Sequence, residues 1–477
     1  MVVEAKVRSL STGTAVGEAA AVCHRTRSWF LAWLAFLPVT VARAGTLAEP
    51  DTFWQVRTGL LTISHRAIPT VDPFSWTAYG KPWTLNSWGF NVFIAGAYRL
   101  AGLSGVAWAC AGLAMVTAGL VLFLARQLRA SPLVAGALLA LSWPLLVAWL
   151  SARPQLIDYI GVLVLAILMP RIVTGRNPIR PVMAVGIVSA VWVNLHTGEL
   201  LGVAMICASA VLLFAGRDTR GSGWCWIAGA AALAASLLNP YGVGLLTHAA
   251  QVESTSSGIV AEWQHLDPGS PMQWSMLSIG LAALLLAARQ RNLIYAGELG
   301  IVAIGAVLAI RLLPILVFLA LPVLAASISQ SPLSGYVHSR RILLYLVTAA
   351  VLAPVVVLAL PSLGHIGRPD PTIYPIKLVK DIPPHCRLYN SYELGSFVIL
   401  ERPDVQVSLD SRNDLYGRQR VLAAEQVLRG QGDVAHELAG ANCVLVPPAT
   451  GLATWLRTNQ GWKLIGSGSA AVLFVRR

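Results

Sequence analysis

The segment TLAEPDTFWQVRTG, residues 46–59, sets charged side chains directly after an apolar stretch of the chain. It contains the carboxylates of Glu49 and Asp51 and the guanidinium of Arg57. Charged groups lose hydration energy beside hydrocarbon, so their presence at the mouth of an apolar segment is costly. This placement indicates a function that needs charge at this point.

The composition is that of a polytopic membrane protein. Of 477 residues, 56% are hydrophobic and 12% are charged, whereas ordinary soluble domains are about 25% charged. The mean hydropathy is +0.65. We therefore expect a mainly α-helical bundle that crosses the cell membrane many times.

The basic net charge also has a membrane explanation. The formal charge is +13, but Lys and Arg stand mostly in short clusters between apolar runs, which is typical of cytoplasmic loops. The pattern argues against a nucleic-acid partner. The first apolar run ends near Arg43 without a small-residue cleavage site, so we expect a retained anchor.

Eleven segments are candidate spans, since a membrane helix needs about 20 mainly apolar residues. They are 28–47, 104–125, 132–150, 155–172, 181–196, 199–216, 223–240, 272–288, 292–310, 312–328 and 342–361. With this count the basic connectors all fall on one side; they are 126–129, 171–180, 216–220, 289–291 and 338–341. The positive-inside rule places them, with the tail 1–27, in the cytoplasm.

The segment 86–102 would reverse this orientation if it also spanned the membrane. Its core from Ser87 to Leu100 extends only about 21 Å at 1.5 Å per residue, against about 30 Å of hydrocarbon. We therefore expect a short helix and a first outer loop at 48–103. Inside that loop, apolar residues recur at helical spacing over 53–63 and predict a helix on the membrane surface.

Residues 365–477 have ordinary charge density and alternate short β-type runs with helical stretches. The β-type runs are 386–390, 405–410, 442–447 and 470–477, and the helical stretches lie near 416–430, 433–440 and 449–459. The alternation predicts a small α/β domain with a partly parallel sheet. An odd number of spans places this domain outside the cell. Cys386 and Cys443 each begin a strand, and both a disulfide and two buried free thiols fit them.

Several motifs along the chain resemble one group of proteins. They are DTFW (51–54), DPFSWTAYGKPW (72–83), RPQ (153–155), WVNLHTGELLG (192–202), NPYG (239–242), EW (262–263) and NSYELG with DSRNDLY (390–416). Together with the long first outer loop and the exported domain, they resemble the GT-C membrane glycosyltransferases, and more closely a group of bacterial multi-pass proteins. The resemblance covers most of the chain.

The resemblance implies transfer of a sugar from a polyprenyl-phosphate donor to a cell-envelope acceptor, either glycan, lipid or protein, on the outer face. An inverting transfer needs a carboxylate to take the acceptor proton and cations to hold the departing phosphate. The base would be Asp51, with Glu49 orienting the acceptor or binding a divalent cation. The phosphate clamp would come from Arg57, Arg153 and Arg311. Many family members have adjacent acids, whereas Pro50 separates this pair.

Structural explanations compete with these roles. Asp51 could cap the following helix or be solvated. Asp72 precedes Pro73, and both a turn and a substrate contact fit it. For Arg153 and Arg311, snorkelling or pairing with Glu262 or Asp158 is the alternative.

Three further pairs are candidate ligand contacts. His196 and Glu199 could bind a metal or substrate, or fix a helix end. Glu262 with Trp263 could bind sugar or anchor the loop at the interface. Asp410 with Arg412 follows a strand, where α/β sheets bind ligands, but an internal salt-bridge cluster fits equally.

Two functions remain. The chain contains no nucleotide-binding loop, nucleophile elbow or zinc motif, which argues against ATP-driven transport and soluble hydrolysis. It is then either a lipid-linked-sugar glycosyltransferase or a non-catalytic scaffold or carrier of the same architecture that binds lipid or glycan. The enzyme hypothesis predicts that Asp51, Arg153 and Arg311 converge on one cavity open to both lipid and the outer space, whereas their dispersal would favour the scaffold or carrier.

Overall fold

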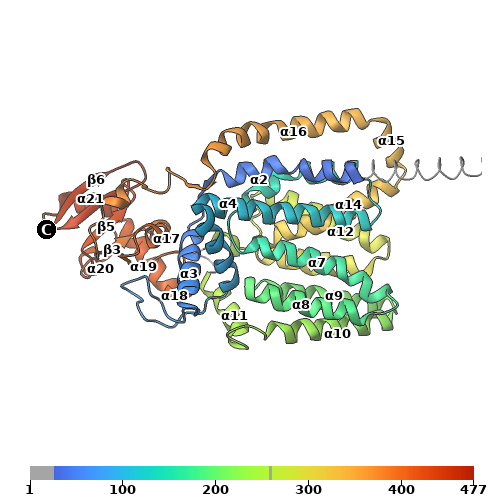
Figure 1. The fold of residues 1–477 in the computed structure, drawn as a ribbon, viewed down its shortest axis with the longest axis horizontal. Coiled ribbons are helices and arrows are strands. Elements are labelled where there is room, and N and C mark those ends of the chain that lie inside the picture. The colour runs from blue at the N-terminus through green and yellow to red at the C-terminus, as the bar shows by residue number, and fades with distance from the viewer. Residues whose placement is uncertain (1–25, 257–259) are drawn as a thin grey trace, which may run out of the picture.

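The computed structural model describes residues 26–256 and 260–477, which form a helical bundle and a sheet region (Figure 1). The bundle helices run side by side, and the sheet with its short helices lies beyond one end of the bundle. Of the predicted tail 1–27, residues 1–25 lie outside the described part of the chain.

The mainly α-helical class is confirmed. The bundle contains α2 (Leu37–Ala44), α4 (Trp88–Gln127), α5 (Pro132–Leu141), α6 (Trp143–Leu146), α7 (Gln155–Thr174), α8 (Ile179–Leu195), α9 (Glu199–Ala215), α10 (Thr219–Ser236), α12 (Pro271–Arg289), α13 (Leu293–Leu308), α14 (Leu313–Gln330), α15 (Leu333–Ser339) and α16 (Arg341–Ser362). Two of them begin at Ser-Pro pairs, where the Oγ atoms of Ser131 and Ser270 accept backbone N–H groups at 3.2 and 3.4 Å. Serine at the N-cap and proline after it favour helix starts.

Five helical segments in the described residues are long and apolar enough to cross a membrane: α4, α7, α12, 310–330 and 341–365. There are six such segments if α5 and the following helical segment Trp143–Trp149 are counted as one span. The two are bent by 48° relative to each other. The apolar helices α8, α9 and α13 are shorter. Each of the eleven predicted segments contains helix, but the count of eleven spans stays a prediction.

The short segment at 86–102 is the first part of α4. Ala101 (φ −148°, ψ 27°) and Gly102 (φ 60°, ψ −150°) leave the helical region and separate it from the longer second part. The helix predicted in the first outer loop is α3 (Asp51–His65), which crosses the end of the bundle (Figure 1). Gly59 lets α3 approach α4 closely, because a Cβ there would lie 2.0 Å from the carbonyl oxygen of Asn91.

The C-terminal sheet is partly parallel, as expected. Its strands are β3 (Arg387–Asn390), β4 (Gln406–Val407), β5 (Cys443–Val446), β6 (Trp462–Ser467) and β7 (Val472–Arg476), in the order β4-β3-β5-β7-β6. β3 runs parallel to β4 and β5, whereas β7 is antiparallel to β5 and β6. The flanking helices are α17 (Tyr392–Glu401), α18 (Asn413–Tyr416), α19 (Arg418–Leu428), α20 (Val434–Glu437) and α21 (Gly451–Thr458). The sequence did not predict β6 or α17; β6 lies at the sheet edge with mostly exposed side chains, so it lacks the apolar run that marks a buried strand.

A disulfide joins Cys386 and Cys443. The sequence had left open a disulfide or two buried free thiols, and the structure contains the disulfide. The cysteines stand at the starts of the paired strands β3 and β5, which brings their side chains together. Among the other described cysteines, Cys110, Cys207 and Cys225 are free.

The first outer loop and the residues just before it pair and pack with the C-terminal region. Ser75 forms a parallel bridge with Val407 of β4, and the strand β1 (Thr46–Leu47) pairs with β2 (Arg368–Pro369). The ring of Phe53 on α3 lies 5.2 Å from that of Phe397 on α17, centroid to centroid. Residues 46–75 therefore pack on the C-terminal region, and the boundary at 364/365, like the independent folding of 365–477, stays a prediction.

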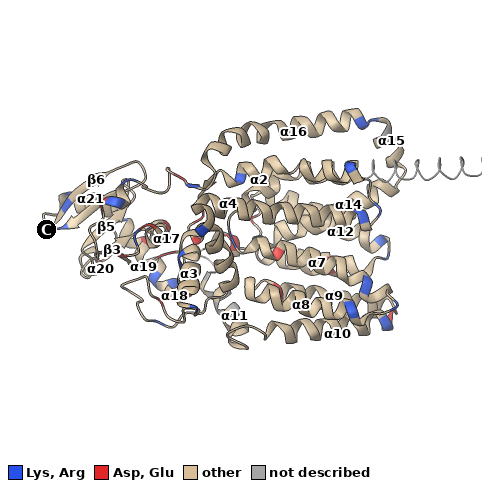
Figure 2. Cartoon of the chain, in the orientation of Figure 1, with Lys and Arg blue, Asp and Glu red and all other residues tan. Residues whose placement is uncertain are grey.

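Lys and Arg residues gather at the end of the bundle away from the sheet (Figure 2). The middle of the bundle is almost free of charge in the same view. This distribution agrees with the expectation that the basic connectors share one side. The sheet lies at the opposite end of the bundle.

Candidate functional site

A cavity of about 750 Å³ lies where the end of the bundle meets the C-terminal region. Its walls come from α3 and the loop that follows it, from the connectors before α7 and α9, from the segment around Glu262, and from α17, α18 and α19. Asp51, Arg153 and Arg311 all line it, as the enzyme hypothesis predicted. Of the other predicted site residues, it is lined by Glu49, His196, Glu262, Trp263 and Arg412.

Asp51 is the first residue of α3, and its carboxylate contacts side chains that line the cavity, one of them from α3 itself. The indole nitrogen of Trp54 donates a hydrogen bond to Oδ1 at 3.1 Å and also lies 3.1 Å from the hydroxyl of Ser411. The N-cap residue is Pro50, and no side-chain cap bond is formed there. Asp51 thus gains from the helix N-terminus electrostatically without capping it.

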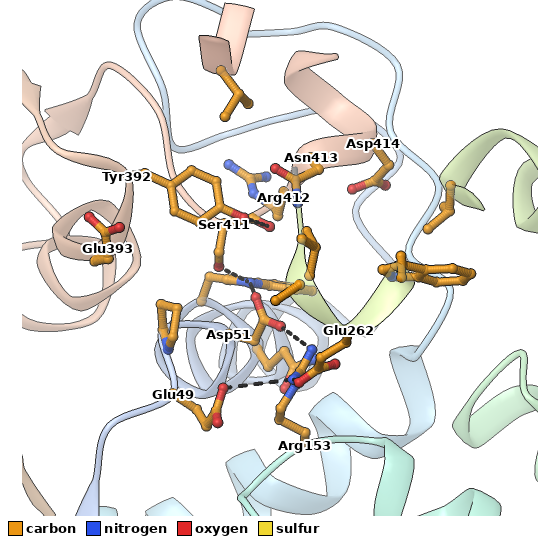
Figure 3. Close-up of a pocket in the computed structure, with 18 of the residues that line it drawn as sticks. Glu49, Asp51, Arg153, Glu262, Tyr392, Glu393, Ser411, Arg412, Asn413 and Asp414 are labelled. Atoms are coloured by element: carbon orange, nitrogen blue, oxygen red, sulfur yellow. Dashed lines mark hydrogen bonds and ion pairs between the residues drawn. The ribbon is translucent and has the colours of Figure 1, made fainter. Parts of the chain in front are cut away.

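Arg153 stands at the centre of the acidic residues (Figure 3). Its Nη2 lies 3.4 Å from Oδ2 of Asp51, and its Nη1 lies 3.8 Å from Oε2 of Glu49 and contacts Oε1 of Glu262. Burial by itself lowers the pKa of Arg153, but the three carboxylates raise it above its ordinary value. The guanidinium is therefore held charged.

Glu49 lies between two arginines. Its Oε1 is 3.5 Å from Nη2 of Arg43, and its other oxygen faces Arg153. Burial raises the pKa of Glu49, and neighbouring Asp51 raises it further, while the two arginines oppose the shift. Glu49 is thus a weaker candidate for a permanent negative charge than Asp51.

Arg311 is held by an aromatic ring. Its guanidinium carbon lies 4.3 Å from the ring centroid of Trp263, a cation–π geometry. It forms no ion pair with the described residues, so its N–H groups are available to an anion. The motif EW therefore supplies both a partner for Arg153 and a platform for Arg311.

The carboxylate of Asp158 orients His196. The sequence had suggested Asp158 only as a partner for an arginine. Nδ1 of His196 lies 2.7 Å from Oδ2 of Asp158, whose Oδ1 accepts a hydrogen bond from Trp192 at 2.8 Å. An ionised carboxylate only accepts, so Nδ1 carries the proton and Nε2 is the nitrogen left for a ligand. Gly198 makes room for this pair, since a Cβ there would lie 2.2 Å from Oδ1 of Asp158.

Glu199 does not join His196. It is fully buried, it accepts a hydrogen bond from Ser236 at 2.6 Å, and it does not line the cavity. His196 follows the end of α8 with extended backbone and bonds to Asp158, whereas Glu199 begins α9 and bonds to Ser236, so the two do not form the predicted shared metal or substrate site. Glu199 is a helix-packing residue here.

Asp72 and Asp410 do not face the cavity, which corrects the expectation for both. They are buried on either side of Arg412, whose Nη2 lies 2.8 Å from Asp72 and 2.6 Å from Asp410. Asp72 also accepts backbone N–H bonds from Phe74 and Ser75, which is the predicted turn. The salt-bridge alternative was correct for this cluster. Arg412 itself reaches the cavity wall, and its buried Nη1 has no protein partner.

Arg57 is also displaced from the expected clamp. One and a half turns along α3 from Asp51, it lies outside the cavity, and its buried Nε lacks a protein partner. Burial lowers the pKa of Arg57. The sequence placed it near the acids but could not show which face of α3 it would occupy.

Sequence reasoning selected only part of the cavity wall that the C-terminal region contributes. Besides Arg412, this wall contains Tyr392, Glu393, Ser411, Asn413 and Asp414, and Figure 3 shows Tyr392 and Ser411 on the side opposite Glu49 and Arg153. All five fall inside the motifs NSYELG and DSRNDLY. Those motifs were a usable signal: of the two members selected from them, Arg412 lines the cavity, whereas Asp410 is buried away from it.

The divalent cation left open beside Glu49 does not fit the residues present. Within 26–256 and 260–477, no group of three His, Cys, Asp or Glu side chains is arranged to hold a metal ion. Glu49, Asp51 and Glu262 do come together, but the guanidinium of Arg153 stands between them. No step is therefore assigned to a metal.

Comparisons with known proteins bear on the fold. No family model and no curated protein matches the sequence. Among solved structures, ArnT from Cupriavidus metallidurans in the apo state is similar with a TM-score of 0.58 and 16% identity, over 97% of this chain and 98% of that one. The archaeal oligosaccharyltransferase AglB from Archaeoglobus fulgidus, in complex with an inhibitory peptide and a dolichol-phosphate, is similar with a TM-score of 0.60 and 11% identity, over 95% and 74%. Both neighbours are GT-C glycosyltransferases, and this membrane protein has the GT-C fold.

Proposed function

We propose that this protein is a membrane glycosyltransferase that moves a sugar from a polyprenyl-phosphate donor to a cell-envelope acceptor. The observation that carries the proposal is the convergence of Asp51, Arg153 and Arg311 on one cavity at the end of the bundle. A lipid-anchored donor can present its phosphate at such a position while its chain stays in the bilayer. The AglB neighbour, bound to a dolichol-phosphate, provides an analogy for this type of ligand.

The proposed chemistry is a single displacement with inversion. Asp51 accepts the proton of the acceptor hydroxyl while the acceptor oxygen attacks the anomeric carbon. The bond between that carbon and the phosphate oxygen breaks, and polyprenyl phosphate leaves with the electron pair. A positioned base is usually worth about 10²–10⁴ in rate, and Arg153, 3.4 Å from Asp51, holds the carboxylate in place.

The leaving phosphate requires cations that are not already occupied by carboxylates. Arg311 meets this requirement best, because it is stacked on Trp263 without an ion pair to the described residues. Nε2 of His196, which accepts when Nδ1 carries the proton, faces the cavity as a partner for a hydroxyl group. Arg57 is withdrawn from the clamp, since it lies elsewhere on α3.

The orientation follows the same proposal. The tail and the basic connectors lie in the cytoplasm, and 365–477 lies outside, where the acceptor is available. The clustering of Lys and Arg away from the sheet supports this (Figure 2). So does the disulfide, because such bonds persist in oxidising compartments.

The alternative is a scaffold or carrier that binds lipid or glycan in this cavity without chemistry. Incubation of the purified protein with a panel of labelled polyprenyl-phosphate sugars and an envelope extract separates the two. Transfer of label to an acceptor supports the enzyme. Saturable donor binding without transfer, across the whole panel, would favour the carrier instead.

A further inference from the structure

Three carboxylates from two separate parts of the chain surround the guanidinium of Arg153 in the cavity. Glu49 precedes α3, Asp51 begins it, and Glu262 lies in the short 3-10 helix at Ala261–Trp263. Convergent carboxylates are the ligand set of a hard divalent cation. Here the position is taken by the guanidinium of Arg153, which divides its two Nη atoms among the three acids.

Arginines already compensate much of the carboxylate charge without a metal. Arg153 contacts all three acids, and Glu49 also lies 3.5 Å from Arg43. A divalent ion placed among the acids would lie beside the guanidinium of Arg153, in a site where the side chains of Arg153 and Asp51 are only 19% and 22% exposed. Two like charges brought together in such a place repel each other, which is unfavourable.

We propose that Arg153 takes the place of a divalent cation among Glu49, Asp51 and Glu262, so that the site works without a bound metal. The inference deepens the proposed sugar transfer, on which its catalytic meaning rests. In that reaction the resident guanidinium holds the carboxylate of Asp51 in position. Arg153 is thus a positioning residue, and its positive charge does not depend on metal supply.

The proposal predicts that removing the guanidinium creates a cation site. Purified full-length protein is titrated with Mn²⁺ while free Mn²⁺ is followed by electron paramagnetic resonance. Wild-type protein should show no stoichiometric binding. Arg153→Ala leaves three carboxylates facing one space, so its affinity for Mn²⁺ should rise by about tenfold or more, because carboxylate count sets affinity. Adding Asp51→Asn and Glu262→Gln to this variant should abolish the gain.

A matched control removes an arginine from an ion pair elsewhere. Arg420 contacts Glu437 in the C-terminal region, outside the cavity. Arg420→Ala frees a single carboxylate and should gain no Mn²⁺ site. If Arg153→Ala does not fold, Arg153→Gln removes the charge at nearly constant size and carries the same expectation.

Two results would overturn the inference. One is stoichiometric Mn²⁺ binding by the wild type that Asp51→Asn weakens, because the metal would then share the site with Arg153. The other is a folded Arg153 variant that gains no binding. Neither readout needs the donor, so an inactive wild type in the transfer assay would count against the proposed function and leave this result standing.

Discussion

Nη2 of Arg153 lies 3.4 Å from Oδ2 of Asp51, although the two residues lie far apart in the sequence. The pair joins the start of α3 to the connector before α7, and both residues line the cavity. The guanidinium fixes one oxygen of Asp51, while the indole of Trp54 donates to the other. The relationship holds the carboxylate in a defined position at the cavity, as a base requires.

The donor phosphate should depend on Arg311. Arg311→Ala removes the guanidinium stacked on Trp263, so we expect kcat/KM for the donor to fall by about 10²-fold, as for loss of a charge-assisted contact in a partly dry site. Arg311→Lys should recover part of this loss by charge alone. Arg57→Ala, outside the cavity, is the control and should leave KM unchanged. Equal effects of Arg57→Ala and Arg311→Ala would place the clamp on α3 instead.

The cluster around Arg412 should matter for stability. Asp410→Asn leaves a buried guanidinium with only Asp72 as its charged partner, and breaking a buried pair typically costs about 3 kcal/mol or more. The midpoint of thermal unfolding in detergent should therefore fall clearly. Asp414→Asn, which loses a contact with His248 at 3.4 Å, should cost less than about 1 kcal/mol. A stable Asp410→Asn protein that cannot transfer sugar would restore the substrate role withdrawn from this residue.

The sequence predicted the features that depend on composition and on the length of apolar segments. Composition and apolar length predicted the helical bundle, and the short core at 86–102 predicted the break in α4. Burial direction was harder to predict. Asp410 and Ser411 are neighbours, yet the first is buried beside Arg412 and the second faces Trp54. Only the packing of the first outer loop against β4, through Ser75 and Val407, decides between them. Such long-range pairing has no local sequence signal.

The disulfide should stabilise the C-terminal region. Cys386 and Cys443 are separated by 57 positions, and closing a loop of that length is worth about 4 kcal/mol in the chain-entropy model. The double variant Cys386→Ser with Cys443→Ser should unfold at a lower temperature. Cys207→Ser, a free cysteine, is the control. Mass shifts with a maleimide before and after reduction count the bonded thiols; unchanged shifts in the wild type would rule out the bond.

Labelling of engineered cysteines tests the orientation. Asn177→Cys lies in a basic connector and Ser469→Cys in the turn between β6 and β7, and both positions are exposed. A membrane-impermeant maleimide on intact cells should label the second variant and leave the first unlabelled until the membrane is opened. The parent protein without substitutions gives the background. Labelling of both sites from outside would show that the number of spans between them is even.

Asp51→Asn is the sharpest test of the proposed base. The substitution keeps the size of the side chain and its capacity to accept from Trp54, but removes the group that takes the acceptor proton. Transfer from the native donor should fall by about 10²-fold or more, with donor binding largely retained. Glu49→Gln should cost less, because burial raises the pKa of Glu49 and its contacts are with Arg43 and Arg153. Near-normal transfer by folded Asp51→Asn protein would mean that Asp51 only holds Arg153 in place, and the base would have to be sought among Glu393, Asp414 and the other acids of the cavity.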